Sequence, residues 1–407
     1  VVYLVLLWCP NMKYNIGISF LFFLLGSVAL GNTQDEHSWI MGIPRPDPIE
    51  YIRPDIIATP TQDVNLLIRE NAWSGKLLVI GISGKHTESI RLCKKYGSHT
   101  QDYGDLVIQI VGMDDKAEIR GIHIYDDVGN VKSAEFHNLK ISTSYGARSP
   151  ILDIARSDRL VFNNITLLPD PDNLTDFGGA GMKWGFDLGD GSDYLHINNC
   201  RRGKGQRFEE HWAYLKSTGE LYITNNDIGG GNRTGFQVRT PGEKEPPHGH
   251  MVIYNNYARD FGWDWGFNNG GSCITIWESL DWPVYIVNNT ITNAKYGCLA
   301  IAHTAPQEVE PHLLPSGRAH SRVTLIGNTF TNPEGDRSCV SINSTEILNV
   351  VSGKFNGGVR PDIIIDSKTA WKWGAPMCMR SFISSTLLGL DIQHWDGDKY
   401  VQWEEGR

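Results

Sequence analysis

The stretch Leu221-Tyr-Ile-Thr-Asn-Asn-Asp-Ile228 is the clearest copy of a pattern that recurs along the chain. A short run of alternating apolar and polar residues, typical of a half-buried strand, leads into an Asn pair, and a second short run follows. Other copies of this shape begin at Leu160, Leu195, Val252, Val284 and Val323, and a weaker one begins at Phe136. Self-similarity of this kind predicts a repeat architecture in which one unit stacks on the next.

The spacing of the copies favours one kind of repeat. The second Asn falls at positions 164, 199, 226, 256, 289 and 328, so neighbouring copies lie 27 to 39 residues apart. Helical-hairpin repeats keep their length more strictly, whereas stacked β-coils tolerate insertions at their turns. Equivalent residues of stacked coils lie about 4.8 Å apart, so a buried Asn can bond to the coils above and below it. The predicted fold is an all-β, right-handed, single-stranded parallel β-helix with N- and C-terminal caps.

A second strand recurs once in each coil. Aligning its copies predicts a column of inward-facing aliphatic side chains, made of Ile154, Leu188, Leu215, Val238, Ile276, Ile301, Ile342 and Ile365. In the same alignment Cys273, Cys298 and Cys339 share one position in three coils. This predicts stacked free thiols, with a disulfide between two neighbours as the alternative.

The sequence predicts four regions. We expect upstream sequence and a signal peptide in residues 1–31, the N-terminal cap and first coils in residues 32–135, the parallel β-helix in residues 136–369, and the C-terminal cap in residues 370–407. The signal peptide is predicted because Met12-Lys13 precedes an apolar run that ends in small residues at Gly31. A membrane anchor is the alternative. We expect a secreted or periplasmic monomer with no stable membrane insertion after signal cleavage.

Composition and charge exclude several classes of protein. The chain has 407 residues, of which 41% are hydrophobic, so it can bury a core and is not disordered. Its formal net charge is −9, which argues against a general polyanion binder. Residues 201–244 nevertheless carry eight Lys or Arg and five Asp or Glu. This local positive charge predicts an anionic substrate, and export together with overall acidity disfavours nucleic acid.

Strand alternation predicts which side chains face away from the core. With Leu215 and Val238 inward, Lys216 and Arg239 face outward on neighbouring coils, 23 residues apart in the chain. The residues predicted around this pair are Tyr214 and Gln237 on the same strands, Asp187 one coil earlier, Trp277 one coil later, and Glu278 and His303 near the strand end.

Two cations stacked one coil apart have a chemical consequence. They repel each other, and this repulsion lowers the pKa of a lysine. Such a lysine is suited to act as a general base near neutral pH, and an anionic ligand between the two cations would remove the repulsion. The alternative is that Lys216 and Arg239 are solvated surface side chains. Arg207, in the basic glycine-containing loop 201–207, is a further candidate for binding an anion.

Acidic residues nearby leave two other chemistries open. Asp187, Glu209 and Glu210 could together hold Ca²⁺, which prefers carboxylate oxygens. Asp187 and Asp190, or Glu278, could instead supply the acid and base of a glycoside hydrolase.

The pattern of strands and asparagines resembles the pectin-lyase-like superfamily of right-handed β-helices, over about residues 130–370. Within it, Trp212-Ala-Tyr-Leu-Lys-Ser217 and Gly235-Phe-Gln-Val-Arg-Thr240 resemble the family of alginate lyases and chondroitinase B. In that family a strand lysine and an arginine of the next coil serve as base and acid. The resemblance implies that Lys216 is the base and Arg239 the acid.

The predicted function is therefore cleavage of an acidic, uronate-containing polysaccharide by β-elimination. Lys216 would take the proton next to the uronate carboxylate, and Arg239, Tyr214 or His211 would assist departure of the linking oxygen. Arg207, Arg239 or Ca²⁺ would neutralise the carboxylate, while Trp277 and Gln237 would contact sugar. A glycoside hydrolase and a non-catalytic carbohydrate-binding β-helix are the alternatives.

Overall fold

The computed structural model describes the greater part of the chain from residue 42 onward. The described residues are 42–73, 75–92, 105–124, 131–142, 152–154, 157–168, 174–175, 179–202, 207–231, 234–239, 249–261, 272–277, 282–302, 320–332, 335, 337–342, 345–365, 380–383, 389–396 and 398–403. The fold described below is that of the unit Ile43–Arg407. The predicted signal peptide lies outside the described residues.

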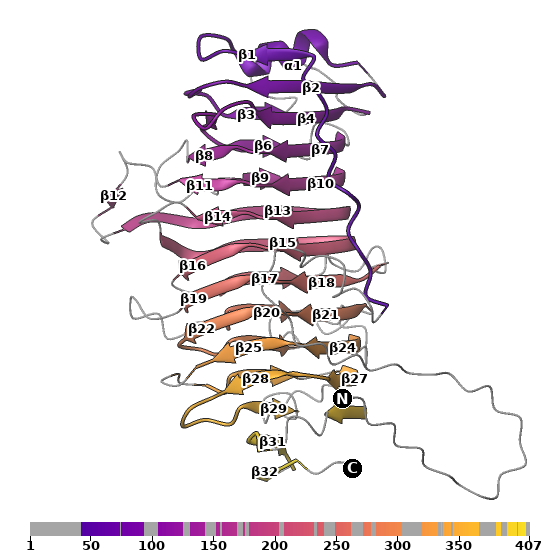
Figure 1. Ribbon diagram of the computed structural model, residues 1–407, viewed down its shortest axis with the longest axis vertical. Helices are drawn as coiled ribbons and strands as arrows, with labels where there is room; N and C mark the ends of the chain where they lie inside the picture. Colours follow the sequence, from indigo (N-terminus) through magenta and orange to yellow (C-terminus); the bar gives the residue numbers. More distant parts are fainter. Residues whose placement is uncertain are drawn as a thin grey trace, which may run out of the picture. The chain divides into compact units, whose positions relative to one another are not determined.

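Nearly all described strands are parallel and stack in three columns, with one strand per coil in each column (Figure 1). The first column contains β1 (Ile56–Ala58), β2 (Leu77–Ile82), β4 (Val107–Gly112), β7 (Val131–His137), β10 (Ser157–Asn163), the C-terminal parts of β13 (Gly179–Asn198) and β15 (Arg207–Thr224), β18 (Met251–Tyr254), β21 (Pro283–Val287), β24 (His320–Ile326), β27 (Thr345–Val350) and β30 (Arg380–Ile383).

The second column contains β5 (Glu118–Ile119), β8 (Lys140–Ser142), β11 (Thr166–Leu168), β14 (Arg201–Arg202), β16 (Asp227–Gly231), β19 (Tyr257–Phe261), β22 (Thr290–Ala294), β25 (Asn328–Thr331) and β28 (Gly353–Asn356). The third contains β3 (Ile90–Leu92), β6 (Ile122–Ile124), β9 (Leu152–Ile154), the N-terminal parts of β13 and β15, β17 (Thr234–Arg239), β20 (Ile274–Trp277), β23 (Leu299–Ala302), β26 (Val340–Ile342), β29 (Ile363–Ile365) and β31 (Ile392–Trp395). This topology fits a parallel β-helix, as the sequence predicts.

Three further elements lie outside this parallel stack. β12 (Leu174–Thr175) pairs antiparallel with β13, and β32 (Tyr400–Gln402) pairs antiparallel with β31. Helix α1 (Val64–Asn71) begins after Asp63, whose side chain accepts hydrogen bonds from two backbone amides of the first turn. α1 contributes Val64 and Ile68 to the hydrophobic core. The described residues include no helix that is both long enough and apolar enough to span a membrane.

The predicted inward column is confirmed. Its eight residues are Cα partners from each coil to the next, from Ile154 and Leu188 at one end to Ile342 and Ile365 at the other. The six members whose side chains are described, from Leu215 onward, are all buried. Strand alternation in the third column is therefore correctly assigned.

The predicted Asn register is wrong in its first two copies. Asn164 and Asn199 align with Asn225, the first residue of its Asn pair, because Phe162, Ile197 and Ile223 are Cα partners two residues earlier. The structure therefore has two Asn columns. One consists of left-handed residues at the corner between the first and second strand columns, with φ between 49° and 58° at Asn138, Asn164, Asn199, Asn225, Asn255 and Asn288, and Gly327 (φ 64°) at the next coil. Asn and Gly adopt this conformation at the least cost.

The other Asn column lies one residue further along and is buried. It runs through Asn226, Asn256, Asn289 and Asn328. Each Nδ2 of the first three donates to the Oδ1 of the next, at 2.8, 2.9 and 3.1 Å. The same Oδ1 atoms accept the backbone N–H of the preceding ladder residue. These amides thus satisfy backbone groups at a corner where no strand pairing occurs.

Three cysteines stack as predicted. Cys273, Cys298 and Cys339 are free and fully buried. The Sγ atoms of Cys298 and Cys339 lie 3.4 Å apart. Burial raises the pKa of the Cys298 thiol well above its usual value, so these thiols act as small apolar side chains of the core.

Candidate functional site

The backbone brings the two predicted catalytic residues into register. Lys216 on β15 and Arg239 on β17 are Cα partners on neighbouring coils. The residue before each of them, Leu215 and Val238, is buried in the core. The side chains of Lys216 and Arg239 lie outside the described residues, so the geometry of this site rests on backbone register.

The neighbouring coils carry the other predicted residues of this face in the expected order. Asp187 is the Cα partner of Tyr214, Tyr214 of Gln237, and Gln237 of Thr275. In the adjacent row, Trp277 is the partner of Arg239. Glu278 and His303 lie outside the described residues. The backbone register therefore brings the described members of the predicted site together on four neighbouring coils.

The side chains of the residues next to Lys216 and Arg239 are less exposed to solvent than strand alternation alone predicts. Gln237 is 8% exposed and Thr275 is 2% exposed, although both occupy positions that alternate with the core. Tyr214 is half-buried. The ring of His211 is buried and lies 5.7 Å from the Tyr214 ring, centroid to centroid. This face would have to open before Gln237 could contact a sugar or His211 could reach the departing oxygen.

Arg207 does not lie near the pair. It is the Cα partner of Gly181, at the start of β15, nine residues before Lys216. Phe208, the next residue, pairs with Gly231 of β16 in the second strand column, whereas Lys216 pairs in the third. Arg207 is therefore left out of the carboxylate-binding site proposed below.

The three predicted calcium ligands are spread along two neighbouring strands. Asp187 is level with Tyr214, four residues further along β15 than Glu210 and five further than Glu209. Four residues of strand correspond to about 13 Å along the backbone. The side chains of all three carboxylates lie outside the described residues, so the calcium site stays a prediction. We therefore derive no step through a metal. Asp190 lies where the pairing of β13 with β15 shifts register, between Leu188 and Ser192.

Sequence reasoning missed one acidic residue. Asp153 on β9 is the Cα partner of Asp187 on β13. It was detectable, because the strand alignment already placed Asp153 directly before Ile154, as Asp187 directly precedes Leu188. Two aspartates therefore occupy one position on neighbouring coils, next to the coil that carries Tyr214.

A buried histidine occupies the same position on the coil that precedes Asp153. His123 on β6 is the Cα partner of Asp153. Burial, and then the nearby charge of Arg91, lower the pKa of His123 to about 4. His196, on the first strand column, is also buried, and its pKa is likewise lowered to about 4. Both rings are therefore neutral in the folded protein at neutral pH.

These two histidines predict a loss of stability in mild acid. Each has a folded-state pKa below its unfolded value near 6.5, so the unfolded chain binds the proton first and stability falls as pH drops from about 6.5 to about 4. Each contributes a loss on the order of 2–3 kcal/mol across this window. Urea unfolding at pH 7.5, 5.5 and 4.5 measures the slope, and His123→Phe should make it shallower. An unchanged slope in both His123→Phe and His196→Phe would contradict the assignment.

Comparisons with known proteins add no assignment: no family model, no curated protein and no solved structure matches this chain.

Proposed function

We propose that the protein is a right-handed parallel β-helix of the pectin-lyase-like type that cleaves an acidic polysaccharide by β-elimination. Right-handed crossovers between parallel strands are the strong general preference. The observation that carries the proposed function is the register of Lys216 with Arg239 on neighbouring coils. It is supported by the excess of basic residues in the surrounding segment of an acidic chain.

The proposed reaction uses both cations. The neutral amine of Lys216 takes the proton from the carbon next to the uronate carboxylate, the bond to the linking oxygen breaks, and a carbon–carbon double bond forms. Repulsion from Arg239 favours the neutral amine. The guanidinium of Arg239 stabilises negative charge on the carboxylate and on the departing oxygen, which takes its proton from solvent or from the Lys216 ammonium. We expect Trp277, which is in backbone register with Arg239 on the following coil, to stack on a neighbouring sugar.

The stacking of Asp153 and Asp187 favours a second candidate function. Neighbouring parallel strands are about 4.8 Å apart, which is close to the separation of about 5 Å between the two carboxyl groups of a retaining glycosidase. In that case one aspartate is the nucleophile and the other is the acid and base. Asp153 joins Asp190 and Glu278 as a candidate partner of Asp187, and it is the candidate whose backbone is in register with Asp187 on the neighbouring coil.

A product assay tests the reaction class. Alginate, pectate and glycosaminoglycans are digested separately while ultraviolet absorbance and new reducing ends are both measured. We expect absorbance to rise with reducing ends, because elimination leaves an unsaturated sugar. Reducing ends without absorbance would replace the lyase by the hydrolase. Substrate binding without either product would identify a carbohydrate-binding protein.

A further inference from the structure

The segment 43–55, Ile-Pro-Arg-Pro-Asp-Pro-Ile-Glu-Tyr-Ile-Arg-Pro-Asp, runs over the outer side of the first strand column (Figure 1). We call residues 45–55 the strap. The backbone of Arg45 contacts β15, and Asp55 contacts β2, so the strap reaches from the coil of β15 back to that of β2. It belongs to no strand of the sheet.

Side chains of the coils hold the strap mainly by its backbone. Gln109 on β4 makes a two-way contact, because its Nε2 donates to the Glu50 carbonyl at 2.9 Å and its Oε1 accepts from the Ile52 amide at 3.1 Å. The Tyr222 hydroxyl donates to the Arg45 carbonyl at 2.9 Å, and the Tyr194 hydroxyl accepts from the Asp47 amide at 2.9 Å. Such contacts hold the backbone of an extended peptide, and they need free amides at positions 47 and 52, where proline has no N–H to donate.

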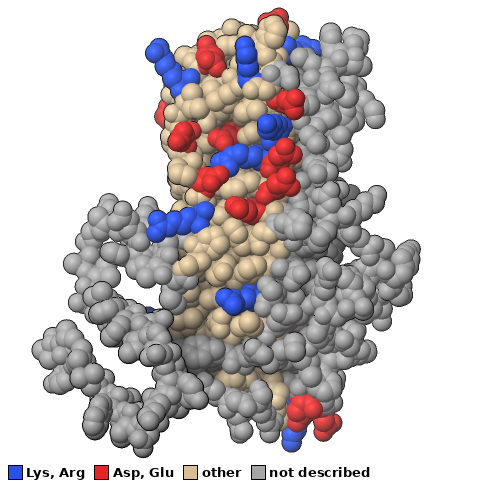
Figure 2. All heavy atoms as spheres, turned by 90° about the vertical axis from the view of Figure 1, so that its right-hand side faces the viewer, with Lys and Arg blue, Asp and Glu red and all other residues tan. Residues whose placement is uncertain are grey.

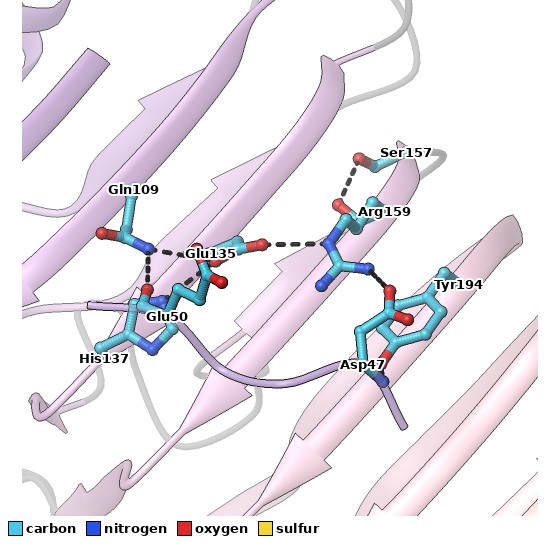
Figure 3. Close-up of polar contacts among 8 residues, drawn as sticks. All are labelled: Asp47, Glu50, Gln109, Glu135, His137, Ser157, Arg159 and Tyr194. Carbon is cyan, nitrogen blue, oxygen red and sulfur yellow. Dashed lines mark hydrogen bonds and ion pairs between the residues drawn. The ribbon is translucent and has the colours of Figure 1, made fainter. Parts of the chain in front are cut away.

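One side chain of the strap adds a charged anchor. Nη1 of Arg159 on β10 donates to a carboxylate oxygen of Asp47 at 2.6 Å (Figure 3). Nε of the same guanidinium donates to Glu135 at 3.0 Å, and Glu135 also accepts from Gln109 at 3.1 Å. The anchor and the backbone contact of Gln109 are therefore parts of one network. Acidic and basic side chains mingle on this side of the coils in Figure 2.

The surface under the strap is aromatic. Tyr194 and Tyr222 are buried, with ring centroids 5.5 Å apart. The His196 ring packs edge-on against both, with centroids 6.4 Å from Tyr194 and 5.8 Å from Tyr222. The Arg159 guanidinium lies 4.2 Å from the centre of the Tyr194 ring. Aromatic surfaces with hydrogen-bonding tips are the usual receptors of proline-rich extended peptides.

The sequence and exposure of the strap favour reversible docking. Prolines at 44, 46, 48 and 54 hold their own backbone and that of the preceding residues extended, so little conformational entropy is lost on docking. Most strap residues are exposed, and Asp47 keeps 60% of its side chain in solvent. Polar contacts rather than core burial therefore hold the strap, and segments held in this way open at low cost.

We propose that this surface is a binding site for an extended, proline-rich acidic peptide, which the strap fills in cis and which the same segment of a second copy fills in trans. The site is formed by Gln109, Glu135, Arg159, Tyr194 and Tyr222. It lies on the first strand column, whereas Lys216 and Arg239 pair on the third, so the proposal is independent of the proposed activity.

The test uses the full chain and a fluorescent synthetic peptide of residues 43–55. In wild type the tethered strap competes at a high effective concentration. Asp47→Ala removes the anchor of the tethered strap but leaves every group of the binding surface intact. We therefore expect the labelled peptide to bind the Asp47→Ala protein roughly tenfold more tightly than wild type in fluorescence anisotropy, since its apparent affinity scales with the open fraction.

Matched controls separate this site from non-specific adsorption. A peptide with alanine in place of its own aspartate at position 47, and a scrambled peptide, should bind the Asp47→Ala protein weakly. Adding Arg159→Met to that protein should abolish the gain. Equal binding of the peptide to wild type and Asp47→Ala, or equal binding of the scrambled peptide, would overturn the proposal.

A second measurement needs no variant. Excess unlabelled peptide should speed hydrogen exchange at the amides of Asp47 and Ile52 in wild-type protein, because a displaced strap loses its partners. Exchange at the first strand column should stay unchanged. Unchanged exchange in the strap at millimolar peptide would also overturn the proposal.

Discussion

Lys216→Ala should lower kcat/KM on the cleaved uronate polymer by at least about 10³, the upper part of the range expected for loss of a general base. The reason is that Lys216 is the residue in register with Arg239 on the preceding coil and is the proposed base. The rise of ultraviolet absorbance during digestion measures the effect. Melting temperature and circular dichroism should match wild type, because Lys216 alternates with the buried Leu215.

Lys354→Ala is the matched control for this variant. Lys354 is an exposed lysine on β28, in the second strand column and away from the pair. Its removal should leave the rate unchanged. Full activity of Lys216→Ala would refute the assigned base. If Asp187→Asn then abolished release of reducing ends, we would assign catalysis to the aspartates in register, Asp153 and Asp187.

Asn256→Ala should destabilise the fold by about 3–5 kcal/mol. The Asn256 Oδ1 accepts from both the backbone amide and the Nδ2 of Asn226, and its Nδ2 donates to the Ile223 carbonyl and to Asn289. Alanine would leave several of these groups buried without partners, and each costs about 1–3 kcal/mol. Urea unfolding at neutral pH measures the loss.

Asn255→Gly is its control. Asn255 is the neighbouring residue, exposed at the corner with φ 54°, a conformation that glycine adopts freely. Its stability should stay within about 1 kcal/mol of wild type. Equal losses in the two variants would show that the buried ladder has no special role.

The fold was predictable because its signals are local and repeated. Alternation fixes which residues of a strand are inward, so the column through Leu215 and Val238 could be read directly. The Asn pairs were harder, because either member fits the same position in a printed alignment. The pairs at 163–164 and 198–199 place their second Asn at the left-handed corner, and Ile165 and Cys200 occupy the ladder position instead.

The register of Lys216 with Arg239 was predictable for the same reason. The backbone register does not bring Arg207 to this pair, because charge counted over a window carries no position along a strand. The strap left no signal in the sequence, since its contacts join residues 147 and 177 positions apart. A proline-rich sequence does not predict which tyrosines of the coils will contact it.

The corner with the left-handed asparagines has one further consequence. In the coils that carry a left-handed Asn or Gly here, four residues separate the two strands, as from Phe136 to Lys140 and from Leu325 to Thr329. The preceding coil differs, since eight residues separate Ile110 from Glu118. From the coil of Phe136 to that of Leu325, variation in coil size therefore arises at the other two corners. An engineer could graft new segments there, whereas one extra residue at the asparagine corner of these coils would displace the left-handed residue and the buried Asn next to it.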